Sequence, residues 1–455
     1  MAQREFDAIV LGAGPAGEVC AGRLADGGLS VAIVESHLIG GECSYYACMP
    51  SKALLRPGEL LDEARRVPGV KEAVGGGLDA GASLRRRDEV IHGLDDSGQL
   101  PWLEHKGVEL VRGQGELDGN RRVAVDDKKL LARKAVVVAT GSAASMPPIH
   151  GLDALDAWSN REATVASQVP ASLIVLGGGP VACELAQAWR SLGSAVSLVE
   201  AAERLLPSEE PFAAKQVTDA LRADDIDVRT GVKASSAARE DGRSVLTLEG
   251  GDSVSGDRIL VAVGRKPRTE RIGLESVGIE PGEYLETDDR LRVDGRDWLY
   301  AIGDVNGRVL LTHMGKYQGR IAADQILGRE TKLRTDGSGS PRVTFTDPQV
   351  AAVGHTLASA EEAGIDAWKL DAETAGTAGA SFYGKGTAGT SRIVIDRDSQ
   401  RLVGATFVGF ETSEFLHAAS VAIAAEVPLE RLRHAVPAFP SRSEVWLKLL
   451  EAAGL

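Results

Sequence analysis

The chain has 455 residues, of which 43% are hydrophobic and 25% charged, and a formal net charge of −14. This length predicts about three globular domains, and the glycine and proline contents are below those of disordered or fibrous chains. The negative charge disfavours nucleic acid and anionic membranes as partners. No apolar run is long enough to span a bilayer, and no export signal is recognised. We therefore expect a cytoplasmic protein without nucleic-acid or membrane partners.

The first predicted element is a buried strand over residues 7–11, followed by the glycine-rich segment of Gly12, Gly14 and Gly17. The first glycine permits a tight turn, the second lets a pyrophosphate approach the backbone, and the third packs helix against strand. The helix N-terminus adds N–H groups and a partial positive charge for the phosphate. Glu35 lies 23 positions after Gly12, at the end of the next apolar run, where its carboxylate would accept ribose hydrogen bonds.

The next segment, residues 40–52, has the sequence GGECSYYACMPSK and places Cys43 five positions before Cys48. In a regular helix this spacing separates the Cα atoms too far for a disulfide, so a bridge requires a distorted turn. A redox-active pair, zinc ligands and two inert buried thiols are the alternatives. Structural zinc needs four ligands, and Cys20 and Cys183 lie inside predicted nucleotide folds, so we favour the redox pair and expect no metal.

A second module repeats the pattern of the first. A strand over 172–176 precedes Gly177, Gly179 and Ala182, and Glu200 again lies 23 positions after the first glycine. Two copies with matching acids predict two bound dinucleotides. A carboxylate at position 200 repels a 2′-phosphate, and residues 201–203 include no arginine, so NADH is favoured over NADPH. Ala182 in the third-glycine place and the nearby Arg204 weaken that preference.

Further elements complete the chain. β-branched runs at 136–141 and 259–264 each end in a glycine and predict buried parallel strands. Residues 146–148 are predicted to be the crossing between modules, and the polar, glycine-rich stretch 334–341 a linker. Beyond it, strands at 392–395 and 402–408 and helices at 413–425 and 444–453 predict an α+β unit. The predicted fold class is α/β, with two Rossmann-like dinucleotide-binding domains followed by an α+β domain.

These motifs, with residues 301–304 and 345–348, resemble the FAD-dependent pyridine nucleotide-disulfide oxidoreductases, the group of dihydrolipoamide dehydrogenase, glutathione reductase and mercuric reductase. The resemblance spans nearly the whole chain. It implies a homodimer with FAD on the first fingerprint and NAD(P)H on the second. The implied domains are an FAD domain over 1–147 and 271–333, an NAD(P) domain over 148–270, and a dimerisation domain over 341–455.

The resemblance also implies a role for individual residues. Cys48 would be the thiol beside the flavin and Cys43 the interchange thiol that meets the substrate. Lys52 and Glu184 would form an ion pair near the reactive flavin nitrogen; the alternative is that both are solvated helix charges. Asp304 would hold the ribityl chain, Thr312 and His313 would approach the isoalloxazine ring, and Gly115 would lie on the adenine side. The remaining implied cofactor positions are Gly41, Thr140, Gly141, Ser142 and Gly264.

One catalytic position departs from the family pattern. In the disulfide reductases a histidine before proline, with a glutamate five positions later, is the acid–base partner of the interchange thiol across the dimer. Here Phe439 replaces the histidine, whereas Glu444 keeps the glutamate spacing. Phenylalanine cannot transfer a proton, and a positioned base contributes about 10²–10⁴ in rate, so efficient disulfide reduction is in doubt. His434, five residues upstream, is the one candidate substitute that we considered.

We therefore predict an NAD(P)H oxidoreductase that passes electrons through FAD and the Cys43–Cys48 disulfide to a disulfide or other thiol-reactive acceptor. Residues 451–455 lack the cysteine pair of mercuric reductase, which disfavours mercury as that acceptor. A diaphorase-like enzyme, in which flavin reduces quinones or metal ions directly, is the alternative. A non-catalytic FAD-binding scaffold is a third hypothesis.

Overall fold

The computed structural model describes residues 3–384 and 389–455, which form two compact units built from interleaved segments. Unit 1 comprises residues 1–50, 88–145 and 265–337, and unit 2 comprises 51–87, 146–264 and 338–455. The boundary between residues 145 and 146 lies at the start of the predicted crossing at 146–148. The boundary between residues 337 and 338 lies inside the predicted linker at 334–341. Across the described ranges, no helix is both long and apolar enough to cross a bilayer.

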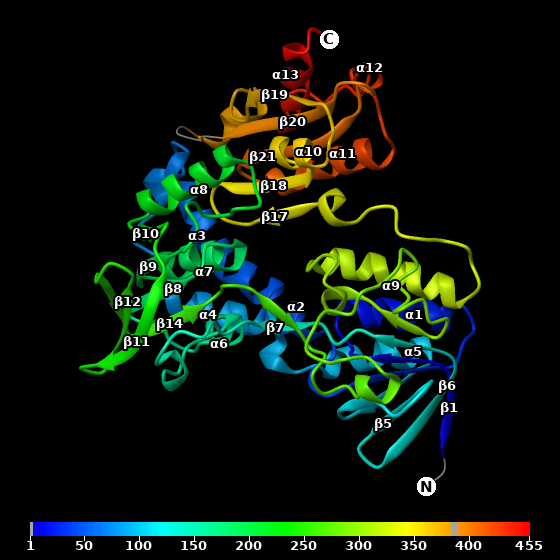
Figure 1. Cartoon of the computed structure of the whole chain (residues 1–455). Helices are drawn as coiled ribbons and strands as arrows, with labels where there is room; N and C mark the ends of the chain where they lie inside the picture. Colours follow the sequence, from blue (N-terminus) through cyan, green and yellow to red (C-terminus); the bar gives the residue numbers. More distant parts are fainter. Residues whose placement is uncertain (1–2, 385–388) are drawn as a thin grey trace. The chain divides into compact units, whose positions relative to one another are not determined.

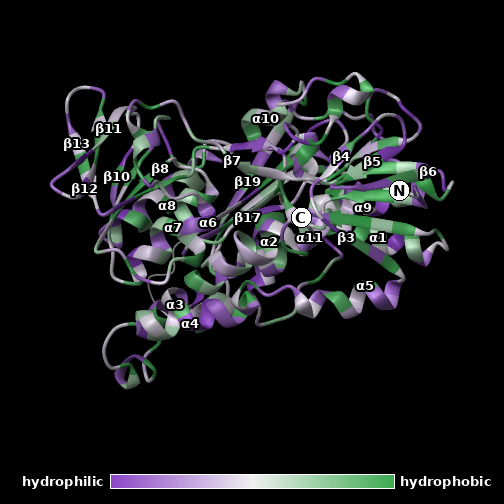
Figure 2. Cartoon of the chain, turned by 90° about the horizontal axis from the view of Figure 1, so that it is seen from below, coloured by the Kyte–Doolittle hydropathy of each residue, from purple (hydrophilic) through white to green (hydrophobic). Residues whose placement is uncertain are grey.

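Unit 1 is organised around one sheet with the strand order β3-β2-β1-β6-β5-β4, in which β16 also pairs with β6. Strands β1 (Arg4–Leu11), β2 (Val31–Glu35), β3 (Val108–Arg112), β6 (Lys128–Val138) and β16 (Leu299–Ala301) are parallel, whereas β4 (Gly115–Leu117) and β5 (Arg122–Val125) are antiparallel additions. Strands β1 and β6 are hydrophobic and buried over residues 8–11 and 135–138, where both faces of the sheet are covered (Figure 2).

Helices α1 (Pro15–Asp26) and α9 (Thr312–Ile326) pack side by side against this sheet (Figure 1). Their backbones approach closely because glycines face Ala16: a Cβ atom at Gly319 would lie 2.7 Å from the Ala16 carbonyl oxygen. Helix α5 (Leu100–Lys106) also contacts α1. This packing brings the start of α9, far away in sequence, next to the first fingerprint.

Unit 2 contains the second parallel sheet, with the strand order β10-β9-β8-β14. Its strands are β8 (Ser172–Leu176), β9 (Ala195–Val199), β10 (Asp227–Arg229) and β14 (Arg258–Val261), and helices α7 (Pro180–Ser191) and α8 (Pro211–Ala223) pack beside them. A small antiparallel sheet of β11 (Ala234–Glu240), β12 (Arg243–Leu248) and β13 (Ser253–Gly256) adjoins it. The two mononucleotide modules thus have the predicted Rossmann-like topology.

The C-terminal part of unit 2 has an antiparallel sheet with the order β17-β18-β21-β20-β19. The strands are β17 (Arg342–Thr344), β18 (Gln349–Gly354), β19 (Ala367–Glu373), β20 (Thr390–Asp396) and β21 (Leu402–Gly409). Helices α11 (Thr412–Ala424) and α13 (Val445–Ala452) pack on this sheet and bury Phe407, Phe415 and Trp446 in one aromatic cluster. The predicted α+β fold of this region is confirmed.

Candidate functional site: two nucleotide cradles and a thiol pair

The first fingerprint forms a tight turn between β1 and α1. Gly12 has a φ of +104°, and a Cβ atom there would lie 2.4 Å from the carbonyl oxygen of Ala139. A Cβ atom at Gly17 would lie 2.0 Å from the Gly12 oxygen, so both positions require glycine. Gly14, the N-cap of α1, has no heavy atom within 4 Å of its missing Cβ. The open space over Gly14 fits a pyrophosphate at the helix N-terminus.

Glu35 is fixed beside this turn at the end of β2. One of its carboxylate oxygens accepts the Ala13 N–H at 2.7 Å, and the other accepts the His37 N–H at 2.7 Å. The carboxylate therefore lies at the strand end next to the glycines, where the dinucleotide pattern places a ribose. These residues fit the adenosine-diphosphate half of FAD.

The second fingerprint has the same geometry with one difference. Gly177 has a φ of +118°, and its missing Cβ would lie 2.4 Å from the Ala262 oxygen, whereas Gly179 again faces open space. Ala182 replaces the third glycine and is fully buried, so this helix tolerates a methyl group at its contact with the strand. One carboxylate oxygen of Glu200 accepts the Ala202 N–H at 2.6 Å. Two equivalent cradles are therefore present, one in each unit.

Cys43 and Cys48 lie on either side of a break between two helices. Helix α2 (Gly41–Tyr45) is followed by its C-cap Tyr46, which has a non-helical φ of −134°. Helix α3 (Cys48–Arg66) begins at Cys48. The distorted turn that a bridge requires is thus present. Cys48 Sγ lies 3.4 Å from Thr312 Oγ1, at the first position of α9.

The Cys43 and Cys48 thiols share a hydrogen bond. A hydrogen bond with Cys48 is the largest cause that raises the pKa of the Cys43 thiol, and burial raises it further. The Thr312 hydroxyl and the positive charge of Lys316 oppose this by lowering the pKa of Cys43. Cys20 and Cys183 are buried, and burial raises the pKa of Cys20 to about 12 and also raises the pKa of Cys183. These thiols are inert, whereas the Cys43–Cys48 pair is accessible.

Lys52 and Glu184 form the predicted ion pair, within unit 2. Lys52 Nζ lies 2.6 Å from Glu184 Oε2, and the Glu184 side chain is only 6% exposed. The second oxygen, Oε1, accepts the Phe345 N–H at 2.9 Å, and Lys52 Nζ lies 4.6 Å from the centroid of the Phe345 ring. The pair is therefore an enclosed, oriented contact, and the alternative of two solvated helix charges is not supported. Lys52 follows Cys48 by one turn of α3.

Asp304 lies in unit 1 at the end of β16. Its carboxylate accepts the Ser142 hydroxyl at 2.6 Å and lies 3.6 Å from Arg265 Nε. Burial raises the pKa of Asp304, a cost that these two partners partly offset. A partly buried carboxylate at this position is suited to accept hydroxyl hydrogen bonds from a ribityl chain.

The other expected cofactor positions lie as follows. Gly41, with a φ of +58°, lies against Gly14, because its missing Cβ would be 3.0 Å from the Gly14 Cα atom. Thr140 and Gly141 follow β6, and the Thr140 hydroxyl donates to the Arg268 oxygen at 2.8 Å. Gly115 begins β4, and His313 is exposed in the first turn of α9; both residues belong to unit 1. Gly264 follows β14 and belongs to unit 2.

The C-terminal candidate residues lie in the segment before α13 in unit 2. Phe439 is 78% exposed, and His434 is exposed as well. Glu444 Oε2 accepts the Ser441 N–H at 3.1 Å and the Gly379 N–H at 3.2 Å, so its carboxylate caps the turn that begins α13. Within unit 2 these contacts hold the turn before α13, and the catalytic role expected for Glu444 stays a prediction.

The sequence interpretation missed two charged residues of unit 1, Glu18 on the first fingerprint helix and Lys316 near the thiol pair. Burial raises the pKa of Glu18, on α1, to about 7; the positive charge of Lys316 opposes the shift, and Glu35 adds to it. Lys316 is on α9, one turn after Thr312, and also acts on Cys43. A carboxyl group inside the otherwise apolar start of the fingerprint helix was the signal that could have revealed this arrangement.

Comparisons with known proteins identify the family. Residues 6–319 match the model of the pyridine nucleotide-disulphide oxidoreductases, and residues 340–450 match their dimerisation domain. The chain belongs to this family. The family binds FAD and uses NAD(P)H, and the protein is an oxidoreductase, which excludes the scaffold hypothesis. The dimerisation domain supports the expected homodimer.

Named relatives align with almost the whole chain. A dihydrolipoyl dehydrogenase of Haloferax volcanii is 31% identical and covers 98% of this chain and 95% of its own. A mercuric reductase of Staphylococcus aureus is 29% identical and covers 94% of this chain and 79% of its own. Among solved structures, the Cu(II) complex of the HOCl-induced flavoprotein disulfide reductase RclA from Escherichia coli superposes with a TM-score of 0.86 at 25% identity, covering 99% of both chains.

Proposed function

We propose that this oxidoreductase takes electrons from NADH and delivers them, through FAD, to a redox-active Cys43–Cys48 disulfide, which reduces a disulfide or another thiol-reactive acceptor. The observation behind this proposal is the placement of Cys43 and Cys48 across the break between α2 and α3, beside Thr312. FAD, when bound, supplies the two-electron carrier between the nicotinamide and the thiols.

The first fingerprint fits the FAD. Gly12, Gly14 and Gly17 form the cradle for its pyrophosphate, and Glu35 and Asp304 are placed to accept hydroxyl hydrogen bonds. The Lys52 ammonium would stabilise negative charge near the reactive ring, while Glu184 offsets the cost of desolvating the lysine. The second fingerprint, with Glu200, then holds the nicotinamide coenzyme.

The thiol chemistry is balanced as follows. Two electrons and one proton delivered to the Cys43–Cys48 disulfide break the S–S bond and leave one thiolate and one thiol. Of the two, Cys48 contacts Thr312 directly, and we assign it the thiolate, as the family resemblance implies. Cys43, once deprotonated, attacks one sulfur of a disulfide acceptor, which breaks the acceptor S–S bond and releases the other half as a thiol. The Cys48 thiolate then attacks the Cys43 sulfur, breaks the mixed disulfide, releases the second thiol and forms the Cys43–Cys48 bond again.

The preference for NADH is supported by two observations in unit 2. Glu200 presents a carboxylate where a 2′-phosphate would lie. Arg204 does not compensate for this charge, because its guanidinium donates to the carbonyl oxygens of Pro207 at 2.7 Å and Glu209 at 3.0 Å.

A direct flavin reductase acting on quinones or metal ions is the second candidate, favoured by one observation. Phe439 occupies the place of the family's proton-transferring histidine and is 78% exposed. An acceptor that takes electrons from the flavin needs no such base.

An anaerobic titration with NADH, followed by visible spectroscopy, distinguishes the candidates. Uptake of four electrons per subunit with a long-wavelength charge-transfer band is expected if the disulfide works. A Cys48→Ser variant should lose the band and take up two electrons. Uptake of two electrons by the unmodified protein would favour the direct reductase and overturn the disulfide mechanism.

A further inference from the structure

The loop between β9 and α8, residues 200–210, runs from Glu200, the residue proposed to bind the coenzyme ribose, to the start of α8. Leu205 and Leu206 in its middle are buried, and the Leu206 N–H donates to the Gly178 oxygen at 2.8 Å. Leu206 adopts a φ of +46°, which is uncommon for leucine and shows that tertiary contacts hold the loop in one conformation.

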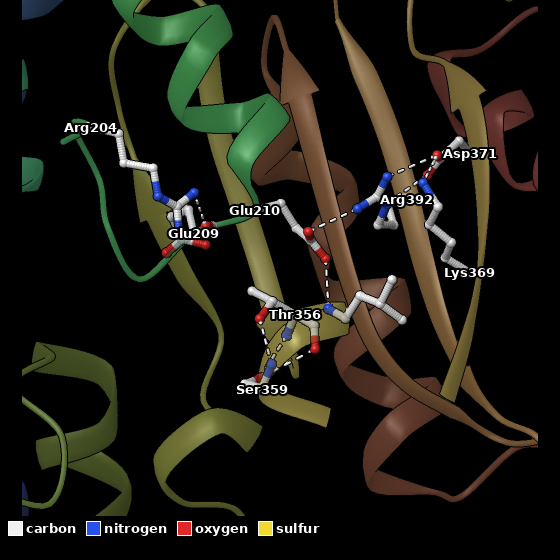
Figure 3. A network of polar contacts seen from close by, with 9 residues as sticks. Arg204, Glu209, Glu210, Thr356, Ser359, Lys369, Asp371 and Arg392 are labelled. Carbon is white, nitrogen blue, oxygen red and sulfur yellow. Dashed lines mark hydrogen bonds and ion pairs between the residues drawn. The ribbon is translucent and has the colours of Figure 1, made fainter. Parts of the chain in front are cut away.

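Arg204 is turned along this loop. Its Nη2 donates to the carbonyl oxygen of Pro207 at 2.7 Å. Its Nη1 donates to the carbonyl oxygen of Glu209 at 3.0 Å (Figure 3). Arg204 is the first arginine after Glu200 in the sequence, and a guanidinium is the group best suited to bind a 2′-phosphate. The loop carbonyls accept one N–H from each terminal nitrogen and so hold the guanidinium along the loop.

The end of the loop is held by two ion pairs from the C-terminal sheet. Arg342, on β17, donates through Nε at 2.7 Å and Nη2 at 3.0 Å to the two carboxylate oxygens of Glu209, whose side chain is 9% exposed. Next to it, Glu210 accepts Arg392 Nη1 at 2.9 Å and the Leu357 N–H at 2.8 Å (Figure 3). Both carboxylates also lie at the N-terminus of α8, where the helix dipole favours negative charge.

We propose that the Glu209–Arg342 ion pair is a determinant of coenzyme specificity: by fixing the Glu209 backbone, it keeps the Arg204 guanidinium on the loop carbonyls and so favours NADH over NADPH. The two residues are positioning residues, because they act through Arg204. This inference rests on the proposed binding of the nicotinamide coenzyme at the second fingerprint. The effect of the ion pair adds to that of Glu200, since a 2′-phosphate would meet the Glu200 carboxylate while the Arg204 guanidinium is bound to the loop carbonyls.

The test replaces the ion pair without changing the net charge. Arg342→Gln alone is unsuitable, because the Glu209 carboxylate would lose its partner and would form an ion pair with Arg204 instead. We would combine Glu209→Gln with Arg342→Gln in a Glu200→Gln background and measure NAD⁺ and NADP⁺ binding to the holoenzyme by calorimetry. The ratio of NADP⁺ to NAD⁺ affinity should rise about tenfold over Glu200→Gln alone, the scale of one charge-assisted phosphate contact.

Two further variants separate positioning from general structure. Adding Arg204→Ala should cancel the gain, because the released guanidinium is its cause. Asp366→Asn with Arg397→Gln, which removes an exposed ion pair of the same unit, should leave the ratio unchanged. The inference is overturned if both coenzymes weaken equally, if the gain persists without Arg204, or if the ratio does not change.

Two controls keep the result interpretable. Circular dichroism and flavin content establish that each variant is folded, and Glu209→Gln with Arg342→Met, a second neutral replacement, should reproduce the gain. Failure of the proposed function has a separate signature, because the unmodified protein would then take up two electrons from NADH without a charge-transfer band, whatever the affinity ratio of the variants.

Discussion

Glu184 uses both of its carboxylate oxygens: Oε2 lies 2.6 Å from Lys52 Nζ, and Oε1 accepts the Phe345 N–H at 2.9 Å. The contact joins α3, α7 and the segment after β17 within unit 2. An Ala at this position would leave a backbone donor and a partly enclosed ammonium without their partner.

We therefore expect Glu184→Ala to lower the free energy of unfolding by about 1–3 kcal/mol, a range discounted because Lys52 is 36% exposed. Urea unfolding of the purified protein measures the change. Glu451→Ala, which breaks the exposed pair with Lys448, is the control and should change stability by less than about 0.5 kcal/mol. Equal stability of the two variants would contradict the structural role of Glu184.

The glycines of the first fingerprint separate cofactor binding from folding. Gly14→Ala should leave the unfolding transition of the flavin-free protein unchanged, since no atom lies within 4 Å of the new methyl group, yet weaken FAD binding. Gly17→Ala should destabilise the flavin-free protein itself by about 1–3 kcal/mol, because its methyl group would overlap the Gly12 oxygen. Denaturation curves and flavin titrations measure both effects. Equal destabilisation by both substitutions would argue against the open cradle at Gly14.

The Thr312 hydroxyl should control the reactivity of the thiol pair. It lies 3.4 Å from Cys48 Sγ and lowers the pKa of Cys43, so Thr312→Val should raise that pKa. The rate of Cys43 alkylation by iodoacetamide in the reduced protein, measured against pH by mass spectrometry, should then shift to higher pH. Thr312→Ser retains a hydroxyl and should resemble the unmodified protein. An unshifted profile for the valine variant would exclude this role.

Glu18 should make stability depend on pH in the flavin-free protein. Burial raises its native pKa to about 7, above the value of about 4.3 for an unfolded glutamate. The native state therefore binds the proton more tightly, and the contribution of Glu18 to stability is lost as pH rises from about 4.5 to 7. Glu18→Gln should stabilise the protein by up to about 3 kcal/mol at pH 8 but little at pH 4.5. Equal effects at both pH values would contradict the raised pKa.

Position 439 should limit exchange with disulfide substrates. Phe439→His restores a proton-transferring group at the family position and should raise NADH-dependent lipoamide reduction at least about tenfold, towards the lower end of general-base effects. Phe439→Ala, which removes the ring without adding a base, is the control. A direct flavin reductase predicts instead that quinone turnover is the same in all three proteins and that the histidine gives no gain with lipoamide.

The sequence by itself determined the two dinucleotide modules and the thiol pair. Both fingerprints depend on local geometry: Gly12 and Gly177 need a positive φ and close approach to a strand carbonyl, which only glycine permits, so the residue type reveals the position. Alternation and β-branched runs likewise predicted β8 and β21, because buried strands impose a local pattern that needs no knowledge of partners.

Only the tertiary structure decided which side chains meet. The pairing of Lys52 with Glu184, 132 positions apart, was expected only from the family resemblance. The pairing of Glu209 with Arg342, 133 positions apart, was not expected, because no local pattern encodes such a contact. The structure also gave Glu444 a capping role and showed that Arg204 is engaged by its own loop. Hydrogen bonds between distant segments depend on how whole units pack, and packing is a property of the folded chain rather than of any stretch of its sequence.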